Sequence, residues 1–329
     1  MESPLLTMPQ PPAAALPAPV LHVLGEALMD CFAEPDGRLL PRMGGSPFNL
    51  ARAAARQGRA VRWLTPFSTD AFGQALLRQA LADGVHPAAP ASPWPTALAV
   101  VSFEGDTARY GFYREGIADR DWSPASVLAA LADQPPGVLH TGSLMLVPPQ
   151  HEATLQVMAT LAARGWTISL DINLRPRLAA DLDAYRAAVW AALAHAHWVK
   201  ASDEDLAVLM DLPALPSLNE APALWQRLRQ PSHRRGALTF GAQGAWLSVA
   251  DRSAASPAAA TQVVDTVGAG DTFWGNCLAD WLGDAQASPG AAADRIDLTL
   301  RRALRAAALN CGRAGCQPPT RAELDAAGG

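Results

Sequence analysis

The chain has 329 residues, of which 50% are apolar and 17% are charged, and its formal net charge is −5. This length and apolar content are enough for one large α/β domain with insertions. The acidic balance argues against a nucleic-acid partner, since such proteins need a basic face.

The sequence indicates neither a membrane protein nor a cross-linked one. No apolar run approaches the ~20 residues that cross a bilayer, and the Pro- and Ala-rich start lacks the basic region of a signal peptide. The four cysteines form no C-x-x-C pair, which argues against a zinc site or a disulfide framework. We expect a cytoplasmic protein without a membrane partner, with a flexible lead-in at 1–18, one domain at 19–317 and a loosely packed tail at 318–329.

The first part of the chain alternates short apolar runs with amphipathic segments. An apolar run bounded by a turn residue indicates a buried strand, and apolar residues at i, i+3 and i+4 indicate a helix. These criteria predict a strand at 20–25, a helix at 48–59, a strand at 61–64 and a helix at 72–83.

Two β-rich runs then break this alternation. The runs at 96–103 and 108–113 flank Glu104-Gly105-Asp106 and indicate a hairpin. Because a hairpin does not fit a strand–helix alternation, we expect a small β-sheet lid on the main domain, formed by about 29–43 and 95–121.

From residue 137 onward the alternation is regular. Strands are expected at 138–140, 167–171, 198–200, 236–240 and 245–249, and helices near 151–164, 182–195, 223–228, 272–282 and 298–311. Strands that alternate with helices predict an α/β fold with a doubly wound, mostly parallel sheet covered on both faces.

Polar residues follow the first strand and open the first helix. Ligands of parallel sheets bind at the carboxyl ends of the strands, and a carboxylate such as Asp30 can accept hydrogen bonds from two adjacent sugar hydroxyls. Gly44 and Gly45 permit close backbone approach, and Asn49 can both donate and accept. Glu26 follows the same strand and could serve in the same way. The alternative is that both carboxylates simply leave the core for solvent and that the glycines form an ordinary turn.

Two later strands also end in polar residues. Asp171, Asn173 and Arg175 alternate along an extended segment, so their side chains are expected on one side, where the arginine can steady a transferring phosphate. The alternative is an exposed loop cluster. Lys200 is the one lysine beside 25 arginines, which indicates either a need for a compact point charge or chance.

The segments after the next strands suggest a nucleotide and its metal. Ser202 and Asp205 are explained either as a helix N-cap and first-turn acid or, for Asp205, as part of a shell that holds Mg²⁺ through water. Thr239, Gly241 and Gly244 form a strand followed by a glycine turn, where a nucleotide can lie against the backbone.

The segment 264–273 carries the strongest signal. A buried strand end at 262–264 is expected to lead through Gly268 and Gly270 into a helix that begins near Asp271. Glycines let backbone N–H groups converge on one point, and a helix N-terminus favours an anion such as phosphate. Asp271 either caps the helix or acts as a general base toward an incoming hydroxyl. No P-loop motif is present, and no G-x-G-x-x-G follows the first strand.

Asp265-Thr-x-Gly-Ala-Gly-Asp271 resembles the signature of the ribokinase-like (phosphofructokinase B type) carbohydrate kinases, and Gly44-Gly45-x-x-x-Asn49 resembles their N-terminal signature. The resemblance covers about residues 20–317. Within the family, segments 25–30, 112–119, 171–175 and 199–202 are most similar to the fructokinases. One departure is that the family's Asn-x-x-Glu near the metal is matched here by Ser202 and Asp205.

The resemblance implies ATP and Mg²⁺, possible activation by K⁺, and possible dimers formed through the lid. It implies Asp271 as the base beside Gly268, Ala269, Gly270 and Arg175. The sugar site would comprise Asp30, Gly44, Gly45, Asn49, Tyr113, Arg114 and Asn173, and the nucleotide site Lys200, Ser202, Thr239, Gly241, Gly244, Thr266 and Asn310.

The function expected from the sequence is phosphorylation of D-fructose to fructose 6-phosphate. Two kinds of alternative stay open at this point. The first is another acceptor on the same fold, with 2-keto-3-deoxygluconate ahead of ribose or a nucleoside. The second is a catalytically silent relative that binds a sugar as a sensor, against which an intact Asp271 argues because a non-catalytic binder needs no base.

Overall fold

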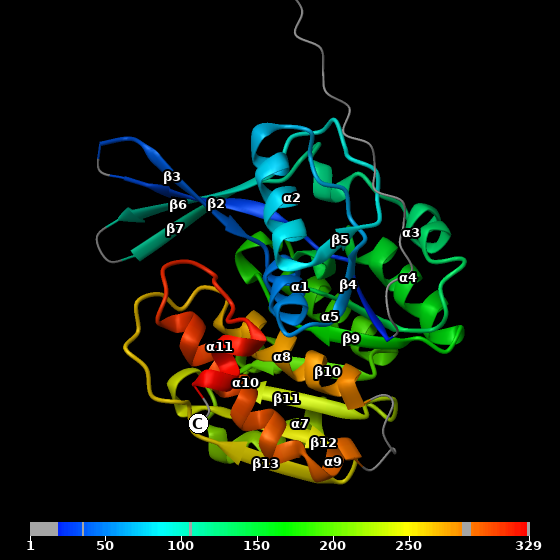
Figure 1. Cartoon of the computed structure of the whole chain (residues 1–329), viewed down its shortest axis with the longest axis vertical. Coiled ribbons are helices and arrows are strands. Elements are labelled where there is room, and N and C mark those ends of the chain that lie inside the picture. Colours follow the sequence, from blue (N-terminus) through cyan, green and yellow to red (C-terminus); the bar gives the residue numbers. More distant parts are fainter. Residues whose placement is uncertain (1–18, 35, 105–106, 285–290, 328–329) are drawn as a thin grey trace, which may run out of the picture.

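The structure, a computed structural model, describes residues 19–34, 36–104, 107–284 and 291–327. In this part the chain forms a nine-stranded sheet flanked by helices and a separate four-stranded sheet (Figure 1). The α/β fold class predicted from the sequence is confirmed. The expected lead-in at 1–18 and the turn at 105–106 lie outside the described residues.

The large sheet has the strand order β13-β12-β11-β10-β9-β8-β1-β4-β5. Its strands are β1 (Val20–Val23), β4 (Ala60–Trp63), β5 (Val85–Pro87), β8 (Val138–Gly142), β9 (Thr167–Asp171), β10 (Trp198–Ser202), β11 (Arg235–Thr239), β12 (Ala245–Val249) and β13 (Arg252–Ser256). All pairs from β11 to β5 are parallel, whereas β12 and β13 are antiparallel additions. The link between β11 and β12 is too short for the crossover that a parallel pair requires.

Helices cover both faces of the large sheet. They are α1 (Ser46–Arg56), α2 (Ala71–Asp83), α3 (Pro124–Ala130), α4 (His151–Ala163), α5 (Leu182–His195), α6 (Asp203–Leu209), α7 (Ala221–Leu228), α8 (Ala269–Asp284), α9 (Ala291–Asp294), α10 (Ile296–Cys311) and α11 (Arg321–Ala326). An apolar core lies between the sheet and each layer of helices. Helices α1, α2, α8 and α10 contribute to one core, and α3 to α7 contribute to the other. The expected stripe of Phe273, Cys277 and Trp281 on α8 is buried in the first of these cores.

The small sheet projects from the main body as the expected lid (Figure 1). It has the order β3-β2-β6-β7, with β2 (Leu28–Ala33), β3 (Leu39–Gly44), β6 (Ala97–Glu104) and β7 (Thr107–Tyr113). The strands match the segments expected for the lid to within one residue, since β2 begins at Leu28 and β3 ends at Gly44. Because β1 continues into β2 and β3 continues into α1, the chain crosses between the sheets beside the carboxyl ends of the parallel strands.

Two expectations about local structure are wrong. The strand expected at 262–264 does not form: Val263 and Val264 are each 60% exposed, and the Val264 N–H donates to the Cys311 carbonyl at the end of α10. The backbone of this run bonds to the end of α10 instead of to a neighbouring strand. The tail expected after residue 317 instead folds into α11, whose N-cap Thr320 forms a capping box with Glu323.

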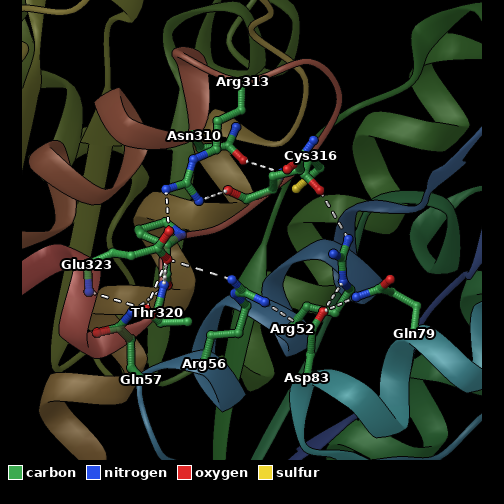
Figure 2. Close-up of polar contacts among 12 residues, drawn as sticks. Arg52, Arg56, Gln57, Gln79, Asp83, Asn310, Arg313, Cys316, Thr320 and Glu323 are labelled. Carbon is green, nitrogen blue, oxygen red and sulfur yellow. Dashed lines mark hydrogen bonds and ion pairs between the residues drawn. The ribbon is translucent and has the colours of Figure 1, made fainter.

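The C-terminal segment packs onto α1 through a polar network (Figure 2). Arg52 donates to the Cys316 carbonyl at 3.2 Å, and the Gln57 side chain donates to the Pro319 carbonyl at 2.9 Å. Leu324 of α11 is 1% exposed. Buried side chains and satisfied backbone carbonyls fix a chain end that composition alone marks as loose.

Candidate active site

A cavity of about 690 Å³ lies at the carboxyl ends of the parallel strands. It is bounded by strands of the lid, by the start of α1, by the segment after β9 and by the loop before α8. Its lining residues are Glu26, Leu28, Asp30, Phe32, Gly45, Ser46, Asn49, Val101, Phe112, Leu144, Leu174, Arg175, Pro176, Arg177, Leu178, Glu204, Val267, Gly268 and Asp271. Segments from four parts of the chain therefore meet in one concave site.

Asp271 lies in the first turn of α8 and is 8% exposed. Its Oδ1 accepts a hydrogen bond from the Ser46 hydroxyl at 2.7 Å, and its Oδ2 accepts one from the Asn49 amide at 2.9 Å. Burial raises the pKa of the carboxyl group, and these two hydrogen bonds oppose that rise. The carboxylate is thus held by side chains of α1 rather than by α8 backbone N–H groups, so the simple helix-cap alternative does not describe it.

The loop before α8 has a conformation that requires glycine. Gly268 has φ +72°, and a Cβ there would lie 2.2 Å from the Cys316 sulfur. The buried Asn310 supports this loop, because its amide donates to the Val267 carbonyl at 2.8 Å. Gly268 and Asn310 thus fix the chain where it enters α8, and the first N–H groups of a helix suit an anion.

Asp265 anchors the same loop to two distant parts of the chain. Its Oδ2 accepts from Arg42 of lid strand β3 at 3.0 Å and from the Gly315 N–H at 2.9 Å, while its Oδ1 accepts from the Val267 N–H at 3.0 Å. The lid, the C-terminal segment and the anion-binding loop are joined at one carboxylate.

Asp30 lines the cavity from lid strand β2. Burial raises its pKa to about 6, an effect that Arg175 opposes and Asp271 reinforces. Gly44 lies on the adjacent strand β3, two residues from Arg42, which pairs with Asp30. A Cβ on Gly44 would lie 2.1 Å from Asp30 Oδ2. Gly44 is therefore needed to admit the carboxylate, and Gly45, with φ +104°, turns the chain from β3 into α1.

The segment after β9 contributes one of its two predicted residues directly. Arg175 lines the cavity, and its Nη1 donates to the Asn173 side-chain oxygen at 2.6 Å. Asn173 does not line the cavity but holds the arginine from a backbone with φ +40°. The alternative of an exposed loop cluster fails for Arg175, because it lines the cavity and its charge acts on both Asp30 and Asp271.

Lys200 lies behind the anion-binding loop. It is 4% exposed and its Nζ pairs with both oxygens of Asp171, at 2.9 and 3.0 Å. Burial lowers the pKa of Lys200, but the carboxylates around it raise it overall, so the ammonium stays charged. A Cβ on Gly270 would lie 3.4 Å from this Nζ. The single lysine thus places a buried positive charge beside the N-terminus of α8.

Ser202 and Asp205 form the cap of α6. The Ser202 hydroxyl accepts from the Asp205 N–H, and the Asp205 carboxylate accepts from the N–H groups of Ser202 at 2.8 Å and Leu174 at 2.6 Å. Both oxygens of Asp205 are used, which favours the cap over a metal shell. Among the residues that the structure describes, no three His, Cys, Asp or Glu side chains gather into a group able to hold a metal.

The other predicted nucleotide residues lie outside the cavity. Thr239 is paired in register with Ser202, so both end their strands at the same edge of the sheet as Asp171. Gly241 and Gly244, with φ +51° and +111°, shape the turn that follows β11. Thr266 is exposed beside Asp265. These residues extend the carboxyl edge of the sheet beyond the cavity.

A sequence profile described as pfkB family carbohydrate kinase matches residues 21–323, nearly the whole described chain. The chain belongs to the pfkB family of carbohydrate kinases. The predicted family and enzyme class are confirmed. Within the described residues, every helix of this carbohydrate kinase falls short of the length and apolarity needed to cross a bilayer.

This pfkB kinase is similar to fructokinases in sequence and in structure. A fructokinase from Rhizobium leguminosarum bv. trifolii is 33% identical over 78% of this chain and 77% of its own length. Fructokinase-1 from Oryza sativa subsp. japonica is 30% identical over 71% and 72%. The crystal structure of a fructokinase with bound ATP from Xylella fastidiosa superposes with a TM-score of 0.79 at 28% identity, covering 93% of this chain and 97% of that one.

The lid residues predicted to bind substrate are placed differently in this kinase. Tyr113 is 64% exposed and does not line the cavity, whereas its neighbour Phe112 does, because successive residues of β7 point to opposite faces. Arg114 is buried, and its Nη2 lies 3.6 Å from Asp119 Oδ1. Its positive charge lowers the pKa of Glu26, which lines the cavity. The lid therefore contributes apolar walls, and Arg114 acts on the site through its charge.

Glu26 and Ser46 line the cavity, although neither belongs to the sugar or nucleotide site predicted from sequence. Glu26 does not leave the core for solvent: it is 1% exposed, and burial raises its pKa to about 7. Ser46 follows the two glycines of the predicted site, and its hydroxyl contacts Asp271. The position of Glu26 directly after β1, at a carboxyl end, was the signal available for the first, whereas no local pattern marks Ser46.

Proposed function

We propose that this carbohydrate kinase transfers the γ-phosphoryl group of ATP to D-fructose, giving fructose 6-phosphate, with Asp271 as the general base. The observation that carries the proposal is that Asp271, Asp30 and the segment that leads into α8, Val267 and Gly268, share one cavity. The named fructokinase relatives support fructose as the acceptor.

Asp271 would accept the proton of the primary hydroxyl as its oxygen attacks the γ-phosphorus. Each oxygen of the carboxylate accepts one hydrogen bond from the protein and keeps a second acceptor position. Asp30, on lid strand β2, would accept hydrogen bonds from other hydroxyls of the sugar. It would in this way fix which hydroxyl meets the base. A base placed in this way contributes roughly 10²–10⁴-fold to the rate.

Positive charge for the transferring group comes from three directions. The start of α8 supplies oriented N–H groups, Lys200 adds a buried ammonium behind Gly270, and Arg175 reaches in from the segment after β9. Phosphoryl transfer depends mainly on positioning and on neutralising charge. The nucleotide would extend from this point along the ends of β10 and β11, past Ser202, Thr239, Gly241 and Gly244, with Thr266 and Asn310 on the other side.

Mg²⁺ fits this site as a companion of ATP rather than as a resident ion. It usually keeps several waters and is held through substrate phosphates, which agrees with an Asp205 whose oxygens are both bonded to backbone N–H groups. When bound, it would neutralise charge on the phosphates. Activation by K⁺ stays a prediction, and the acidic group that precedes the loop, Asp265, is already paired with Arg42.

The lid would close the site over the sugar. Phe32, Val101 and Phe112 from three of its strands line the cavity with apolar surface. Excluding water at this wall would prevent wasteful hydrolysis of ATP.

The test is a coupled ADP-release assay with Mg²⁺–ATP and a panel of fructose, 2-keto-3-deoxygluconate, ribose, glucose and adenosine. We expect the highest kcat/KM with fructose. A preference for another acceptor would keep the mechanism and reject the substrate. Sugar binding without turnover of any acceptor would reject the kinase mechanism in favour of a sugar sensor.

We also propose that the lid mediates a homodimer. Leu39 and Leu40 at the start of β3 are 49% and 45% exposed, and Tyr113 adds apolar surface on β7. Exposed apolar groups on both edge strands of this small sheet suit a second copy of the chain. Sedimentation velocity should give the mass of a dimer, and Leu40→Asp should shift it to a monomer; a monomer for the unaltered protein would reject the proposal.

A further inference from the structure

The start of α1 contacts the proposed base directly. The Ser46 hydroxyl donates to Asp271 Oδ1 at 2.7 Å, although the two residues are 225 positions apart in the chain. Both side chains are buried and both line the cavity. The hydroxyl does not cap α1, because the N-cap residue of that helix is Gly45. Its contact is therefore with the site and not with its own helix.

The backbone around Ser46 is fixed on the other side as well. The Ser46 N–H donates to Glu26 Oε1 at 3.3 Å, and a Cβ on Gly45 would lie 2.4 Å from the Glu26 carbonyl oxygen. Pro47 follows in the first turn of the helix and restricts the backbone further. The hydroxyl thus approaches Asp271 from a support that has little freedom to move.

We propose that Ser46 is a positioning residue for this kinase, whose hydroxyl orients the Asp271 carboxylate for proton abstraction. The inference rests on the proposed role of Asp271 as the base. Asn49 holds Oδ2, so removal of the Ser46 contact leaves the carboxylate secured through one oxygen only. It can then rotate about its Cβ–Cγ bond, and a smaller share of the population faces the substrate hydroxyl.

The same contact favours the ionised form of the base. The other charged groups that act on Asp271 come from separate elements and are unchanged by a substitution at residue 46: Arg175, Lys200, Asp171 and Asp30. The thiol of Cys316 also faces it. Loss of the Ser46 hydrogen bond removes an effect that lowers the pKa of Asp271, so this pKa rises. Because the base acts when ionised, the acid limb of the rate profile moves to higher pH.

The experiment compares Ser46→Ala with Ser92→Ala in the full chain. Ser92 is a matched control, since its buried hydroxyl donates to the Asp121 carboxylate at 2.6 Å away from the cavity. For Ser46→Ala we expect kcat to fall roughly 10-fold at neutral pH, with the acid limb of the kcat profile raised by about one pH unit. The KM for the sugar should change less than about threefold, since Ser46 positions the base and not the sugar. Ser46→Thr, which keeps a hydroxyl, should restore the original pH profile.

Three outcomes would overturn the inference: an unshifted profile with full kcat in Ser46→Ala, an equal loss in Ser92→Ala, or a fall in kcat at all pH values without a shifted limb. Circular dichroism and the thermal midpoint show whether each variant is folded, and Ser46→Thr gives a second variant if alanine is poorly tolerated. Turnover by Asp271→Asn tests the underlying assignment separately. If Asp271→Asn is inactive while Ser46→Ala is normal, only the role of Ser46 fails.

Discussion

Asp271→Asn should reduce kcat by roughly 10²–10⁴-fold while leaving ATP binding nearly unchanged. Asparagine has almost the shape of aspartate and can still accept from the Ser46 hydroxyl at the position of Oδ1. It cannot take up the proton of the attacking hydroxyl, so the loss falls on the chemical step. Steady-state ADP release gives kcat, and isothermal titration of ATP into the variant gives the affinity.

Asp121→Asn provides a matched control for this substitution. Asp121 also accepts a hydrogen bond from a serine hydroxyl, that of Ser92, but lies outside the cavity. It should keep the kcat of the unaltered protein. Near-normal turnover by Asp271→Asn would mean that the hydroxyl loses its proton to another group or to solvent, and the assignment of the base would be abandoned.

Gly268→Ala is the second substitution with a large expected effect. At φ +72° an alanine incurs roughly 1–2 kcal/mol of backbone strain, and its Cβ would lie 2.2 Å from the Cys316 sulfur and 2.7 Å from the Cys316 Cβ. Relief of this overlap costs about a further 1–3 kcal/mol in the free energy of unfolding. It also displaces the N–H groups that face the transferring phosphate, so kcat should fall by roughly 10²–10³-fold.

Gly165→Ala isolates the conformational part of this effect. Gly165 has φ +82°, close to that of Gly268, but a Cβ there has no atom within 4 Å. It should therefore lower the thermal midpoint modestly through strain alone and leave kcat unchanged. Urea unfolding and the ADP-release assay on both variants distinguish the two contributions. Equal effects on stability and activity at the two positions would mean that contact with Cys316 does not matter for the loop.

Much of the architecture follows from local pattern. The helix expected at 182–195 is α5 with the same bounds, and the strand expected at 167–171 is β9 with the same bounds. Long amphipathic helices and short buried strands between glycine turns carry strong periodic signals. The run at 262–264 carries the same apolar signal and forms no strand, because its backbone bonds to the end of α10, a contact between distant segments that no local pattern reports.

The sequence by itself determined the αβ alternation, the lid, the glycine loop and the carboxylate at the start of α8, since each depends on residues close together in the chain. Only the tertiary structure decided which side chains meet that carboxylate. Ser46 and Asn49 reach Asp271 across more than 220 positions, and Cys316 packs under Gly268 from a segment that composition marks as a loose tail. Such contacts arise from packing α1, α8 and the C-terminal segment on one face of the sheet, and packing between distant segments leaves no periodic trace in the sequence.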